Sequence, residues 1–147
     1  MNHRQAINAS RRTSSPRRSP RRRGVAAVEF AIVAPLFFLL VIGIIEICRA
    51  MMVQQVLINA SRVGARRAIT MSSNEQAVTD AVNEYVNGMG VSGVDIEVSP
   101  NPATAAAGQA ITVDVDIPFQ EVSWLPAPWF MGGKNLAASS VMRKEGF

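Results

Sequence analysis

The most apolar part of the chain is a single block at residues 25–48, VAAVEFAIVAPLFFLLVIGIIEIC. Charged residues occur in it only at Glu29 and Glu46, near its two ends, where each carboxylate can reach polar surroundings. At about 1.5 Å per residue, a helix over this block covers roughly 36 Å, enough for a tilted crossing of the hydrocarbon core of a bilayer. We therefore expect a transmembrane helix over residues 25–48.

Apolar residues then recur every three or four positions, which predicts that the helix continues beyond the bilayer as a stalk over residues 49–72. Its apolar face comprises Val53, Val56, Leu57, Ala60, Val63 and Gly64. Such a face can pack on the chain's own domain, on partner subunits, or on both. A second helix should begin near Ser73, because residues 73–76 (SNEQ) offer a capping box, and end at Gly88 and Gly90.

After Gly90 the apolar period changes to two, which is typical of half-buried strands. Two alternating segments run over residues 94–98 and 111–117, with a loop at 101–108 between them, and a third strand is expected over 136–143. Three strands and a covering helix make a small domain over residues 73–147. The predicted fold class is α+β: a long N-terminal transmembrane and stalk helix, a short second helix and a small antiparallel sheet.

Charge divides the chain at Gly24. Residues 1–24 contain eight arginines and no acid, whereas the rest has seven basic and eleven acidic side chains. The Ser, Pro and Arg composition of this leader gives it nothing to bury in a core. Because the leader adjoins an apolar span, its arginines should keep the N-terminus in the cytoplasm and place residues 49–147 outside.

Other interpretations of this N-terminal region fit less well. A nucleic-acid-binding tail would have aromatic residues or a folded partner motif, so we expect no nucleic-acid partner. A secretory signal would have a shorter apolar region and a small-x-small cleavage site, which residues 47–50 do not provide. A lipoprotein signal needs small residues before its cysteine, but Glu46 and Ile47 precede Cys48. We interpret Cys48 as a buried or lipid-facing thiol.

Glu29 is the most informative residue of the chain. A carboxylate near the start of an apolar helix costs a few kcal/mol and usually has a partner. A position at the headgroup boundary, near a helix N-terminus, would explain why Glu29 is tolerated. That position would not explain its spacing from Arg21, Arg22, Arg23 and Gly24.

The junction at residues 24–30, GVAAVEF, resembles the leader junction of type IV pilins, in which a basic leader ends in Gly and Glu is the fifth mature residue. More narrowly, RRRGVAAVEFAIVAPLFFLLVIGIIEICRA resembles the TadE-like family, minor pseudopilins of the tight-adherence (Flp, type IVb) pilus system. The resemblance covers residues 21–70 and includes Pro35, Gly43 and Glu46. Residues 136–145 resemble the closing strand of that family. Sister pseudopilins of the same system share much of this N-terminal pattern.

The resemblance implies roles for individual residues. A prepilin peptidase would remove residues 1–24 by cutting after Gly24, and Val25 would carry the new amine. Glu29 would pair with the Val25 amine of a neighbouring subunit, because both charges are costly when unpaired in a low-dielectric bundle. Phe30 stands where the major pilin of that system usually has Tyr. That departure, and the 123 residues left after cleavage, favour a minor subunit.

The implied partners are other pilin or pseudopilin subunits, the pilus assembly platform and membrane lipid. The expected location is the bacterial inner membrane, with possible incorporation into a surface pilus. Pro35 removes the helical donor to the Ala31 carbonyl and should bend the helix gently. The alternative function is an uncleaved single-pass membrane protein with an extracytoplasmic binding domain.

We expect no enzyme activity, cofactor or metal. The only histidine is His3, in the leader, and no nucleophile with an identifiable base or phosphate-binding loop is present. Four acids could suggest calcium, but they alternate with apolar residues and indicate the solvated face of a sheet. They are Asp95, Glu97, Asp114 and Asp116. The loop at residues 122–133 holds Trp124, Trp129 and Phe130, which could anchor a partner or close a small core.

Overall fold

The structure is a computed structural model that describes residues 21–124 and 132–146, with side chains from residue 24 onward. Most of the predicted leader, residues 1–20, lies outside the described residues, as do Trp129 and Phe130. The chain comprises two compact units, Met1–Phe38 and Leu39–Phe147.

Helix α1 spans Arg21–Ala68, so the predicted transmembrane and stalk segments belong to one helix of 48 residues. Its stretch from Gly24 is long and apolar enough to cross a membrane, by length and composition. Arg66 and Arg67 occupy its last turn, where cations interact favourably with the helix dipole. The helix ends four residues before the predicted end of the stalk at residue 72.

Helix α2 spans Glu75–Gly88, as the apolar period predicts. Its N-cap is Asn74, whose side-chain oxygen accepts a hydrogen bond from the Ala77 amide at 2.8 Å. The predicted capping box at Ser73 is therefore wrong by one residue. Asn caps a helix as well as Ser does, and Ser73 is buried in the preceding turn, where its amide bonds the Thr70 carbonyl.

The C-terminus of α2 closes with a Schellman motif. The Val91 amide bonds the Val86 carbonyl at 2.9 Å, and the Gly90 amide bonds the Asn87 carbonyl at 3.0 Å. Gly90 has φ +74°, a conformation that glycine adopts without penalty. The two glycines that the sequence indicated as the end of this helix thus end it.

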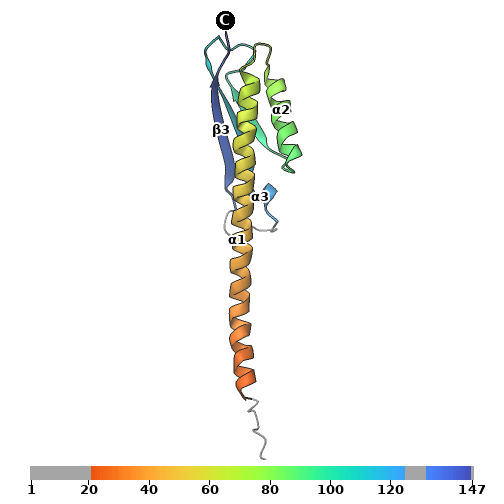
Figure 1. The fold of residues 1–147 in the computed structure, drawn as a ribbon, viewed down its shortest axis with the longest axis vertical. Coiled ribbons are helices and arrows are strands. Elements are labelled where there is room, and N and C mark those ends of the chain that lie inside the picture. Colours follow the sequence, from red (N-terminus) through yellow and green to blue (C-terminus); the bar gives the residue numbers. More distant parts are fainter. Residues whose placement is uncertain (1–20, 125–131, 147) are drawn as a thin grey trace, which may run out of the picture. The chain divides into compact units, whose positions relative to one another are not determined.

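The sheet has three antiparallel strands in the order β1-β2-β3, which confirms the predicted α+β fold class (Figure 1). The strands are β1 (Asp95–Ser99), β2 (Ala110–Pro118) and β3 (Asn135–Arg143). One face is buried: β2 turns Ile111, Val113, Val115 and Ile117 into the core. Its opposite face carries the polar positions of the same strands, so the alternation in the sequence becomes two faces of a half-buried sheet.

The core of the Leu39–Phe147 unit joins this sheet face to both helices. Val78, Val82 and Val86 of α2 belong to the same buried cluster as Val53, Leu57 and Ala60 of the predicted apolar face of α1. Val56 of that face is partly buried against the cluster, whereas Val63 is half-buried and does not belong to it. Two polar contacts tie α1 to β3: the Ser61 and Ser140 hydroxyls are 2.8 Å apart, and Gln54 donates to the Ala137 carbonyl at 2.8 Å. The stalk helix therefore packs on the chain's own domain.

Gly64 allows the closest packing in this core. A Cβ atom there would lie 2.7 Å from a methyl carbon of Val82 and 2.9 Å from one of Val113. Real Cβ atoms essentially never approach so closely, so the absence of a side chain lets α1 contact α2 and β2 together.

The residues that follow β3 form hydrogen bonds to the turn after α1. The buried Lys144 ammonium donates to the Thr70 and Pro102 carbonyls, both at 2.9 Å. The Glu145 amide bonds the Ile69 carbonyl at 3.1 Å. The C-terminal strand thus closes the domain against α1 and the loop after β1.

A short helix, α3 (Phe119–Val122), follows β2 directly and was not predicted. Phe119 and Val122 are buried, and their spacing of three residues places both on the core side of a single turn.

Candidate functional site

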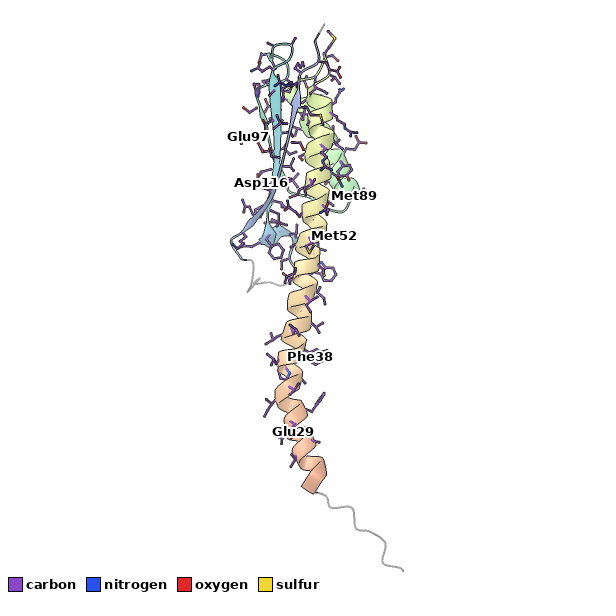
Figure 2. The ribbon with its side chains drawn as sticks, turned by 60° about the vertical axis from the view of Figure 1, so that its left-hand side comes forward. Glu29, Phe38, Met52, Met89, Glu97 and Asp116 are labelled. Carbon is purple, nitrogen blue, oxygen red and sulfur yellow. The ribbon has the colours of Figure 1, made fainter. Side chains whose placement is uncertain are left out.

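Glu29 lies exposed on α1 within the Met1–Phe38 unit (Figure 2). Around it Val25, Val28, Phe30 and Ile32 are also exposed, by 60–72%. Within the described residues no hydrogen bond or ion pair of its carboxylate is recorded. Glu29 is therefore a charged group on an apolar helix surface, and it needs an external partner once water is removed.

The two residues of the predicted cleavage junction lie in helical backbone. Among the described residues, and apart from the neighbouring backbone of its own helix, no atom lies within 4 Å of the position where a Cβ on Gly24 would stand, and Val25 is 60% exposed. Val25 and Glu29 are four residues apart and so share one side of α1. An amine at Val25 would lie one helical turn from the Glu29 carboxylate.

Pro35 lies inside α1 next to an apolar surface hollow. The hollow is lined by Phe30, Val33, Ala34, Phe37 and Phe38. The rings of Phe37 and Phe38 meet edge to face with centroids 5.9 Å apart. A small side chain between aromatic rings makes a depression that a neighbouring apolar helix could fill.

A second polar cluster, which we call the Glu46 cluster, joins α1 to the segment after α3. Glu46 is only 5% exposed and accepts a hydrogen bond from the Ser123 hydroxyl at 2.8 Å. Arg49 donates its Nε–H to the Val122 carbonyl, and its guanidinium carbon lies 5.0 Å from the ring centroid of Trp124. The cluster comprises Glu46, Arg49, Val122, Ser123 and Trp124.

Sequence reasoning missed the Glu46 cluster. Glu46 was expected to reach polar surroundings at the membrane boundary, and instead it is buried against its own domain. The only available signal was the three-residue spacing of Glu46 and Arg49, which places both on one side of the helix. Their partners follow more than 70 residues later, in a segment with no recognisable pattern.

The four acids of the sheet lie on its open face, as predicted. The strand register sets Asp95 opposite Asp116, and Glu97 opposite Asp114. Figure 2 shows Glu97 and Asp116 on the side of the sheet away from α1. Within the described residues no group of three or more His, Cys, Asp or Glu side chains has an arrangement that could hold a metal ion.

Comparison with known protein families gives one match, and it covers most of α1. Residues 24–66 match the family model described as TadE-like protein. No curated protein and no solved structure matches the chain. The matched range contains Gly24, Val25, Glu29 and Pro35, and it also contains the two α1 residues of the Glu46 cluster.

The family match and the fold point to the same kind of molecule. The long apolar helix suggests a membrane anchor, and TadE-like pilus proteins are structural rather than enzymatic. Residues 24–66 are thus similar to the TadE-like family, and membership of that family implies a component of Tad pilus assembly.

Proposed function

We propose that this chain is a minor pseudopilin-type subunit of a Tad (Flp) pilus apparatus, trimmed after Gly24 by a prepilin peptidase. The observation that carries the proposal is the exposed Glu29 carboxylate on an apolar helix, within the segment that matches the family. A protein that acted alone would gain nothing from a charge in this position.

The surroundings of Glu29 favour assembly through helix packing. The exposed apolar side chains of residues 25–40 need lipid or other helices around them. In those surroundings an unpaired carboxylate is costly, and so is the ammonium that cleavage creates at Val25. A neighbouring subunit that brings its Val25 amine to Glu29 removes both costs and sets the axial register between subunits.

Charge supports one orientation. The eight arginines that precede Val25 favour a cytoplasmic N-terminus, so residues 49–147 would lie on the far side of the inner membrane. The partners would be the prepilin peptidase, other pilin or pseudopilin subunits and the assembly platform.

The mass of the protein extracted from its native membrane tests the proposal. We expect a mature form that begins at Val25 and lacks residues 1–24. A chain that keeps its arginine tract would overturn the pseudopilin function, and would favour an uncleaved single-pass protein with an extracytoplasmic binding domain.

A further inference from the structure

Trp124 is the exposed aromatic residue of the Glu46 cluster. Its side chain is 72% exposed, but its ring makes a cation–π contact with Arg49, whose guanidinium carbon lies 5.0 Å from the ring centroid. Arg49 is in turn held by the Val122 carbonyl. The ring is thus held in a defined place while most of its surface has no cover from the described residues.

The position of this ring follows from the helix that holds it. Arg49 is the first residue after the apolar run at 25–48, a run about as long as a bilayer crossing requires. A cation at that point would meet the headgroup region. Trp124 contacts Arg49, so its ring would lie at the same depth as the end of the membrane-spanning helix.

The surroundings of the ring are those of a membrane interface. Ile47, Met51 and Met52 on the adjoining turns of α1 are 52–64% exposed. The Glu46 carboxylate, which would otherwise face lipid here, is buried beneath Ser123. Glu121 on α3 is exposed and has a charge opposite in sign to that of Arg49, so the indole ring, and not attraction to anionic lipid, favours a lipid partner.

We propose that Trp124 is an interfacial anchor that seats the outer domain on the headgroup region of the leaflet it faces. The amphipathic indole, with an apolar ring and one N–H donor, is the side chain best suited to that region. Arg49 and the Glu46–Ser123 hydrogen bond position it. The inference rests on the membrane placement of α1 in the proposed function, and commits to lipid as the occupant.

Depth-dependent fluorescence quenching tests the anchor. The full chain with Trp129→Phe keeps Trp124 as its only tryptophan and is reconstituted in phosphatidylcholine vesicles. Lipids brominated near the headgroup should quench its emission at least about twofold more than lipids brominated near the chain ends, as expected for an interfacial ring. Adding phosphatidylglycerol should leave this ratio unchanged.

Two variants separate positioning from chance exposure. Arg49→Gln should lower the quenching by lipids brominated near the headgroup, because the indole ring loses its cation–π contact with Arg49. Arg62→Gln, an exposed arginine further along the same helix, should leave it as in the parent. Equal effects of the two variants would overturn the positioning role of Arg49.

Three results would overturn the anchor. Emission that aqueous iodide quenches fully and brominated lipid does not would place Trp124 in water. Emission that changes with the protein-to-lipid ratio would assign the ring to a second copy of the chain. Release of the chain by alkaline carbonate would overturn the membrane placement itself, whereas a carbonate-resistant chain with Trp124 in water would overturn the anchor alone.

Discussion

Two carboxylates on the same helix have opposite surroundings. Glu46 is buried and accepts a hydrogen bond from Ser123, so its charge is satisfied within the chain. Glu29 is exposed among apolar side chains, and no partner is recorded for it within residues 24–124 and 132–146. A carboxylate that is hydrogen-bonded within its own chain stabilises the fold. A carboxylate that is exposed on an apolar surface is instead a candidate for pairing with a second molecule.

Replacing Glu29 tests that distinction directly. Glu29→Gln should leave trimming after Gly24 intact but lower piliation by at least about tenfold, because an ammonium left unpaired in a bundle costs about 3–5 kcal/mol. Electron microscopy and sheared-pilus immunoblots measure this loss. Glu97→Gln, on the open face of the sheet, is the matched control and should leave piliation unchanged. Full piliation in the Glu29 variant would contradict the proposed pairing.

Gly24 offers a clean test of processing. No atom lies within 4 Å of the site of a Cβ on Gly24, so a larger side chain disturbs no packing in the described structure. Gly24→Leu should therefore abolish trimming through the peptidase rather than through misfolding, and mass spectrometry of the extracted protein would show the full-length chain. Cleavage at the wild-type rate would mean that Gly24 is not part of the recognised junction.

Gly64 is the residue on which the helix packing depends most. Gly64→Ala introduces a Cβ at 2.7 Å from Val82 and 2.9 Å from Val113, which should destabilise the outer domain by about 1–3 kcal/mol. In a domain of 60–100 residues, each kcal/mol lowers Tm by about 4–8 °C. Gly88→Ala, where a Cβ meets no atom within 4 Å, is the control and should change Tm much less.

At the scale of elements, periodicity predicts what lies inside one segment and misses what joins segments. The apolar block and the three- to four-residue spacing after it located α1, the same spacing located α2, and alternation located β1 and β2. The expected third strand over 136–143 corresponds to β3, although its residues do not alternate cleanly. The cap at Asn74 was misplaced because neighbouring Ser and Asn are equally good caps, and only the buried turn at Ser73 distinguishes them. The Glu46 cluster could not be predicted, because Glu46 and Ser123 are 77 residues apart.

The register of β1 and β2 sets like charges opposite each other. Glu97 faces Asp114 and Asp95 faces Asp116 across the open face, an arrangement that destabilises a sheet. Asp114→Asn should therefore raise the free energy of unfolding by about 0.2–1 kcal/mol. Denaturant titrations at low and high salt measure it. The gain should shrink in about 1 M salt, where the screening length falls to about 3 Å. A loss of stability would mean that Asp114 makes a favourable contact.

At the scale of the whole molecule, buried side chains occur only from the middle of α1 onward in the described sequence. Among the described residues, the first buried side chain is Glu46, and the first buried apolar one is Ala50. In the described part of the Met1–Phe38 unit, the side chains from residue 24 onward are therefore exposed or half-buried, and the Leu39–Phe147 unit holds the packing that stabilises the fold.

A fragment of residues 46–147 should consequently fold without the membrane segment. We expect a single cooperative thermal transition by circular dichroism, since the fragment retains every buried apolar residue of the described core. Gly64→Leu in the same fragment should abolish or strongly lower that transition. A fragment that stays unfolded while the full chain in vesicles is folded would show that the segment before residue 46 is needed for stability.

The fastening of Lys144 to the end of α1 has a consequence for how the protein is made. β3 supplies one edge of the sheet, and the residue just after it bonds the carbonyls of Thr70 and Pro102. Until residues 135–144 have been synthesised, β2 therefore lacks one of its two neighbouring strands, and the Thr70 and Pro102 carbonyls lack the Lys144 ammonium. A chain truncated before β3 should therefore keep an unpaired sheet edge at β2, and such an edge favours aggregation.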